Sequence, residues 1–159
     1  NENMVDNPKF YKEGQECFEK AYRLTPYNIP VITNLASTYQ LNGKLDEAET
    51  LFNEALKISQ DFDEAKLNLA ALYYNKKDYD KAYSLINEVN ATSKNPKYQT
   101  YLVTILNQKI NAYLKTVTDK AAIDKLVKNV TSKEALLKLF FDAKSKNVDF
   151  ETYLAQAEF

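Results

Sequence analysis

The stretch PVITNLASTYQLNGKLDEAETLFNEALKIS, residues 30–59, decides the fold of this chain. Before its Asn-Gly step, apolar residues recur every three or four positions at Ile32, Leu35, Ala36 and Tyr39. After that step the same spacing returns with Leu45, Ala48, Leu51, Phe52 and Ala55. This is the period of an α-helix with one apolar face, and Gly43 supplies the backbone freedom that a helix end needs. The stretch therefore predicts two amphipathic helices joined by a tight turn.

The same pattern returns downstream with a fixed offset. Leu35 falls on Leu69, Tyr39 on Tyr73 and Ala48 on Ala82. Upstream, the places of Ala48, Phe52 and Ala55 are taken by Gly14, Phe18 and Ala21. A constant offset of this size indicates a solenoid, in which one helical hairpin cannot bury its apolar face alone and stacks on its neighbours. The offset equals the distance in sequence from Leu35 to Leu69, and we call a stretch of this length one repeat.

The residues that carry the match, Asn-Leu-Ala…Tyr…Ala…Phe…Ala, resemble the tetratricopeptide repeat over roughly residues 1–96. The resemblance implies an all-α fold, a right-handed solenoid of antiparallel hairpins with about seven to eight helices. We expect one domain over residues 1–159. Its parts would be a partial repeat (1–28), two repeats (29–62 and 63–96), a divergent hairpin (97–130) and a terminal hairpin or cap (131–159).

The C-terminal part follows the helical-hairpin pattern but not the repeat sequence. From Pro96 an apolar stripe continues to Leu114 without a Gly or Pro, which predicts a longer first helix for the third hairpin. Further stripes predict helices that begin near Thr118, near Ser132 and near Asp149, each with a capping side chain.

The composition argues against catalysis. The chain has no His, so the commonest general base and the usual metal ligand are absent. Its two glycines, Gly14 and Gly43, are isolated and cannot build a phosphate-binding loop. The single cysteine, Cys17, lies beside Phe18 on an expected helix, and we interpret it as a small packed residue. We therefore expect no enzyme activity, no cofactor and no metal.

The net charge and the hydropathy limit the classes of binding partner that we expect. A net charge of −1 gives no overall field that would recruit nucleic acid, and no apolar run approaches the ~20 residues that span a bilayer. We expect a protein or peptide partner, with neither nucleic-acid binding nor direct membrane insertion. The chain begins at Asn1 rather than Met, so we expect a mature form or a piece of a longer protein, and the compartment stays open.

A binding face can be assigned from the resemblance, which implies that the first helix of each hairpin lines a concave groove. The candidate groove residues are Thr33, Asn34, Ser37, Gln40, Glu64, Leu67, Asn68, Ala71, Tyr74, Asn75, Tyr98 and Tyr101. The positions where a carboxylate clamp would need Lys or Arg hold Thr33, Ser37, Glu64 and Asn68, so a clamp for a C-terminal carboxylate is not expected. The remaining residues predict a polar-to-apolar groove for an uncharged or mixed segment.

Asn34 and Asn68 are the sharpest feature of that face. A side-chain amide can donate to a peptide C=O and accept from a peptide N–H, and so can hold an extended chain. The alternative is that both amides only bond neighbouring helices. Three functions remain open: a peptide-binding scaffold, a structural or self-assembly module that uses its terminal repeats, and an accessory domain of a larger enzyme or of a secretion or envelope complex.

Overall fold

A computed structural model of the chain describes residues 8–93 and 95–116, and beyond them 118, 121, 124, 128, 132, 135, 138–139, 142–143, 145–148, 152–153 and 156. Six helices have defined bounds, and no strand occurs among these residues. The predicted all-α class is confirmed, but the helix count of six is lower than the seven to eight expected. Beyond Thr118 several described residues are helical, among them 142–143 and 152–153, but no helix there has defined bounds, so the helices expected in that part stay a prediction.

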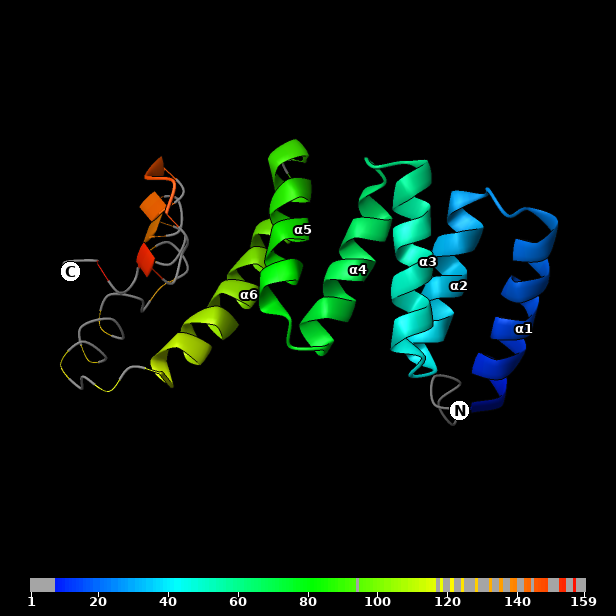
Figure 1. Cartoon of the computed structure of the whole chain (residues 1–159), viewed down its shortest axis with the longest axis horizontal. Helices are drawn as coiled ribbons and strands as arrows, with labels where there is room; N and C mark the ends of the chain where they lie inside the picture. The colour runs from blue at the N-terminus through cyan, green and yellow to red at the C-terminus, as the bar shows by residue number, and fades with distance from the viewer. Residues whose placement is uncertain are drawn as a thin grey trace. The chain divides into compact units, whose positions relative to one another are not determined.

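The chain divides into two compact units, Asn1–Val89 and Asn90–Phe159. The expectation of one domain over the whole chain stays a prediction. The first unit holds α1 (Pro8–Leu24), α2 (Ile29–Leu41), α3 (Leu45–Ile58), α4 (Asp63–Asn75) and most of α5 (Tyr79–Thr92). Figure 1 shows that each of these helices runs opposite to the one before it, with α2 behind α3 in this view. Helix α2 is central, because it packs against α1, α3 and α4.

The turn between α2 and α3 is built as the Asn-Gly step predicts. Gly43 has a φ of 76°, its N–H donates to the Gln40 carbonyl at 3.1 Å, and the Lys44 N–H donates to the Tyr39 carbonyl at 2.9 Å. These two hydrogen bonds satisfy backbone carbonyls at the end of α2 that have no donor within the helix. The turn between α4 and α5 makes the same two bonds one repeat later, at 3.0 and 2.9 Å, but Lys77 there takes the left-handed conformation with a φ of 62°.

This pair of turns gives a first prediction. Gly43→Ala should destabilise the first unit by about 1 kcal/mol, because a side chain at positive φ is strained. The space beside Gly43 is open, so conformation alone sets this cost. Lys77→Gly should instead stabilise by about 0.5–1 kcal/mol, since it relieves the same strain. Urea denaturation followed by circular dichroism measures both changes, and a loss of stability in Lys77→Gly would contradict the explanation.

The core of the first unit follows the small–large–small pattern of α3. Ala48, Phe52 and Ala55 have no exposed surface, and Leu35 and Leu69 are each 2% exposed. Small residues let the neighbouring helices approach, and the phenyl ring fills the space between them. The apolar stripe predicted from the sequence is therefore the core, while Tyr39 and Leu45 lie half-buried at its edge.

The second unit begins with the end of α5 and contains α6 (Pro96–Leu114), whose 19 residues confirm the longer helix expected there. Its buried stripe consists of Leu102, Ile105, Leu106 and Ile110. The Asn95 side chain accepts from the Lys97 N–H at 3.0 Å, next to Pro96 at the first helical position. Of the helices with bounds, none is both long and apolar enough to cross a membrane.

Candidate functional site

The candidate face is formed by α2 and α4, the first helices of the two repeats. Ser37 and Gln40 lie on the side of α2 opposite Leu35 and Tyr39, because successive helical residues are rotated by about 100°. The same spacing on α4 sets its polar and small residues opposite its own core stripe. We call this surface the inner face; it comprises Asn34, Ser37, Gln40, Glu64, Leu67, Asn68, Ala71, Tyr74 and Asn75.

Asn68 connects the two helices of the inner face. Its Nδ2 donates to the Ser37 hydroxyl at 3.4 Å, a long bond, and the Ser37 hydroxyl donates to the Thr33 carbonyl at 2.9 Å. The structure thus gives Asn68 a contact with the neighbouring helix. Asn34 differs: its side chain is exposed and makes no hydrogen bond to the residues that the structure describes. Its amide keeps both donors and its acceptor available.

The other predicted residues differ in their access to solvent. Exposed with Asn34 are Glu64, Ala71 and Asn75, whereas Ser37, Gln40, Leu67, Asn68 and Tyr74 are half-buried. Thr33 is only 1% exposed, so its prediction as an exposed groove residue is wrong. The prediction assumed one covered face for α2, but three helices pack around it.

Tyr98 and Tyr101 lie on α6 in the second unit and are therefore considered separately from the inner face. Tyr98 is half-buried and Tyr101 is 39% exposed. The Lys97 ammonium lies 5.7 Å from the centre of the Tyr101 ring. Their part in a peptide groove stays a prediction.

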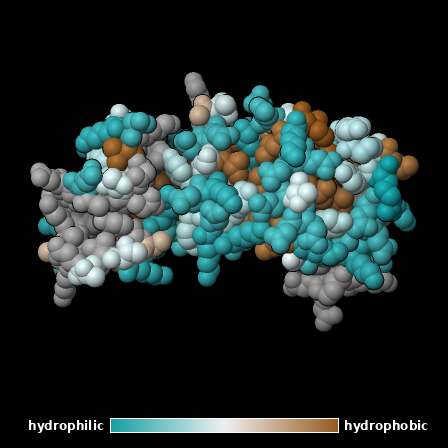
Figure 2. Space-filling view, in the orientation of Figure 1, coloured by the Kyte–Doolittle hydropathy of each residue, from teal (hydrophilic) through white to brown (hydrophobic). Residues whose placement is uncertain are grey.

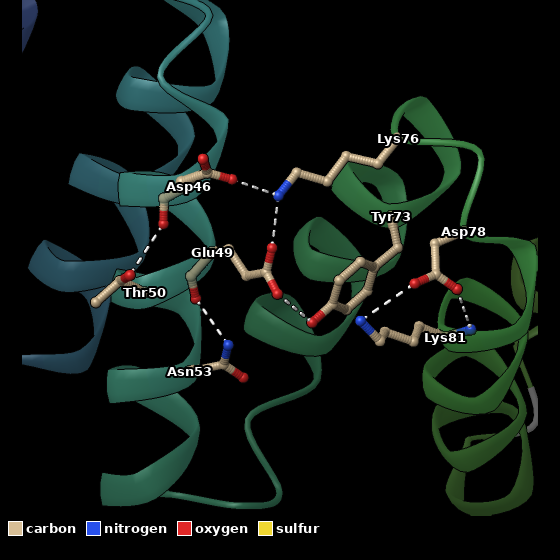
Figure 3. A network of polar contacts seen from close by, with 8 residues as sticks. All are labelled: Asp46, Glu49, Thr50, Asn53, Tyr73, Lys76, Asp78 and Lys81. Carbon is tan, nitrogen blue, oxygen red and sulfur yellow. Dashed lines mark hydrogen bonds and ion pairs between the residues drawn. The ribbon is translucent and has the colours of Figure 1, made fainter.

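A charged network joins α3 to α4 (Figure 3). The Lys76 ammonium contacts Asp46 and Glu49, each at 2.7 Å, and the Tyr73 hydroxyl donates to Glu49 at 2.7 Å. These residues were not predicted as a group from the sequence. Because Lys76 caps the end of α4, the network fixes that end of α4 against α3.

The preceding junction, between α1 and α2, has a related arrangement in which a bond between two neutral amides replaces the Lys76–Glu49 ion pair. One repeat earlier, Asn42 Nδ2 donates to Gln15 Oε1 at 2.8 Å, at the places of Lys76 and Glu49. The Tyr39 hydroxyl donates to a carboxylate of α1, Glu19, at 3.0 Å. The repeat register pairs Tyr39 with Tyr73 but places Gln15, not Glu19, at the position of Glu49, so the register alone does not predict the Tyr39–Glu19 bond.

The electrostatics of the α3–α4 network follow from its contacts. The hydrogen bond from Lys76 lowers the pKa of Glu49; burial opposes this, and the Tyr73 hydroxyl adds to it. The same ammonium lowers the pKa of Asp46. Burial, together with the bond to Glu49, raises the pKa of Tyr73 to about 12. At neutral pH the network therefore holds two carboxylates, one ammonium and one neutral phenol.

A concave surface lies on another side of α2. We call it the outer groove; it is lined by Glu19, Tyr22, Arg23, Leu35, Tyr39, Glu47, Thr50 and Leu51. Its walls come from α1 and α3, and its floor comes from α2. Figure 2 shows apolar surface gathered between charged side chains over the half of the view that holds α1 to α4. This groove was not predicted from the sequence.

Two features of the described part of the chain bear on metal binding and on cysteine chemistry. No group of three or more Cys, Asp or Glu residues there is arranged to hold a metal ion. Cys17 is exposed, so its interpretation as a packed residue is wrong. It stands one position before the stripe of Gly14, Phe18 and Ala21, and a shift of one position turns a helical side chain by about 100°.

Two models of the tetratricopeptide repeat match the chain, one over residues 17–50 and the other over residues 42–103. The hairpins α2–α3 and α4–α5 fall inside these ranges. The chain therefore belongs to the tetratricopeptide repeat family, as the sequence predicted. Repeats of this family generally mediate protein–protein interactions and are generally not enzymes.

A curated relative is similar to part of the chain. The chain is 33% identical over 93 residues to the TPR repeat-containing protein YpiA of Bacillus subtilis (strain 168). The similar region is 58% of this chain and 22% of that protein, so the chain spans about a fifth of the relative's length.

Proposed function

We propose that this chain is a non-enzymatic scaffold whose inner face binds an extended peptide or a segment of a partner protein. The hairpins would continue as a right-handed solenoid through one repeat domain, so that successive first helices share one binding surface. Tyr98 and Tyr101 would extend that surface. Nucleic acid and membranes are not among the partners proposed, and self-assembly through the terminal repeats is the alternative.

The pair of amides on adjacent first helices carries this proposal. Asn68 bonds Ser37 across the two helices, which brings the inner side of α4 beside that of α2. Asn34 is exposed with its amide unused among the described residues. Amides of this kind satisfy peptide C=O and N–H groups without reading side chains. The half-buried Leu67 and Tyr74 offer shallow apolar contacts beside them.

The test uses a peptide selected for binding from a random display library. The Asn34→Ala, Asn68→Ala double variant should bind it about ten- to a hundredfold more weakly, because each lost amide removes hydrogen bonds worth about 0.5–1.5 kcal/mol. Isothermal titration calorimetry gives the affinities. Asn53→Ala is the matched control, since Asn53 is an exposed amide on α3 whose side chain bonds the Glu49 carbonyl in its own helix. Equal affinity of wild type and double variant would remove the inner face from the function.

A further inference from the structure

The outer groove is a concave surface formed by side chains of α1, α2 and α3. It has a volume of about 480 Å³. Leu35 and Leu51, 2% and 8% exposed, supply its apolar base. The Tyr22 hydroxyl of α1 donates to Glu54 of α3 at 2.8 Å and bridges the two walls. The groove faces away from Ser37 and Gln40, because Leu35 and Tyr39 lie on the opposite side of α2.

Each wall of the outer groove carries a carboxylate. On α1, Glu19 accepts from the Gln15 amide at 2.6 Å and from the Tyr39 hydroxyl at 3.0 Å. The Gln15 hydrogen bond lowers the pKa of Glu19 most and the Tyr39 hydrogen bond lowers it further, so this carboxylate stays ionised beside apolar surface. On α3, Glu47 is exposed and makes no hydrogen bond or ion pair with the residues that the structure describes. Arg23 is the one cation among the lining residues.

In the next repeat the corresponding positions keep the apolar leucines but not the two carboxylates. One repeat on, Leu35 and Leu51 become Leu69 and Leu85. The charged positions change as follows: Glu19 becomes Asn53, Arg23 becomes Lys57 and Glu47 becomes Lys81. The leucines are thus common to both repeats, whereas the two carboxylates are particular to the first groove. Glu19 also accepts from Tyr39, but Glu47 has no partner among the described residues, and Arg23 is the one lining cation, so the groove carries an excess of negative charge that is complementary to a cation.

We propose that the outer groove binds a partner protein segment in which an aliphatic side chain is flanked by Arg or Lys. The aliphatic group lies on Leu35 and Leu51, and the cation lies between Glu19 and Glu47. Removing the aliphatic surface from water supplies most of the affinity. The charges select the segment and orient it. This site is separate from the inner face and does not depend on the function proposed for it.

The probe is an acetylated and amidated peptide, Gly-Arg-Leu-Leu-Arg-Gly, titrated into the 15N-labelled full chain. The amide signals of Thr50 and Leu51 should shift with saturation, and raising the salt should weaken binding because part of the attraction is between exposed charges. The Glu19→Gln, Glu47→Gln double variant should bind about three- to tenfold more weakly. Peptides with Glu in place of Arg, or Ser in place of Leu, should bind far more weakly than the probe.

Two further variants distinguish a loss of binding from a loss of folding. Thr50→Trp, an exposed position on the wall of the groove, should block the probe, whereas Ser84→Trp, the equivalent exposed position of the next repeat, should not. The Asn34→Ala, Asn68→Ala variant should bind the probe as the wild type does. The proposal is overturned if the probe shifts no groove amide, if the Glu peptide binds equally well, or if Thr50→Trp leaves binding unchanged.

Discussion

Phe52→Ala should lower the unfolding free energy of the first unit by about 3–5 kcal/mol, the range for deleting a buried phenyl ring. Phe52 has no exposed surface and stands between Ala48 and Ala55, which are also fully buried. Alanines cannot move in to fill the space that the ring leaves, so the cavity persists. Native-state hydrogen exchange of the amides in α2, α3 and α4 measures the loss within this unit.

Phe18→Ala is the matched control for that variant. Phe18 occupies the same place in the preceding copy of the repeat, but it is only half-buried. Its replacement should cost well under half as much, because part of its ring already contacts water. Equal losses for the two variants would contradict the assignment of Phe52 as the centre of the core.

Glu49→Ala should cost about 1–3 kcal/mol, the second largest effect expected. Glu49 accepts from both Tyr73 and Lys76, and its loss leaves the hydroxyl of Tyr73, a residue only 8% exposed, without this acceptor. Lys76 keeps its contact with the exposed Asp46, which limits the damage. Gln15→Ala, the neutral counterpart on α1, should cost less than about 1 kcal/mol, because its exposed partner Asn42 can turn to water and its other partner, Glu19, keeps the Tyr39 hydroxyl. Urea denaturation compares the two, and a larger loss at Gln15 would contradict the role given to the charged network.

The same network sets a pH dependence. A carboxylate whose pKa is lowered by folding stabilises the folded state above its unfolded pKa, and this contribution is lost as the pH falls through the folded value. For Glu49, whose ordinary value is 4.5, the loss therefore begins below that pH. At the alkaline end, the contribution of Tyr73 is complete below its ordinary pKa of 10 and is lost as the pH rises toward about 12. Glu49→Gln should flatten the acid limb of a plot of thermal midpoint against pH, and an unchanged limb would exclude Glu49 as its source.

The fold of the first unit could be predicted because its signals are local. The three-and-four spacing and the Asn42-Gly43 step place α2 and α3, and the repeat register carries them to α4 and α5. The second turn was less evident, since Lys77 adopts the conformation that Gly43 marks in the first. Two backbone hydrogen bonds that close the end of α4, to the carbonyls of Tyr73 and Tyr74, hold that conformation against the intrinsic preference of lysine.

The site could be predicted only in part because burial depends on neighbours. Thr33 belongs to the polar side of α2 by its spacing, yet the helices around α2 bury it. Cys17 was expected to pack and is exposed. The outer groove was not predicted because it needs residues from three helices, and spacing along one helix says nothing about the distance between Glu19 and Glu47.

The most direct test of the central claim is to map a bound peptide onto the first unit. A peptide selected for binding from a random library is titrated into the 15N-labelled chain, and amide and side-chain NH2 signals are followed. The proposed function predicts that the Asn34 and Asn68 side-chain signals shift together with the amides of Ser37 and Ala71. Shifts confined to other surfaces, with Asn34 and Asn68 unchanged at saturation, would contradict it.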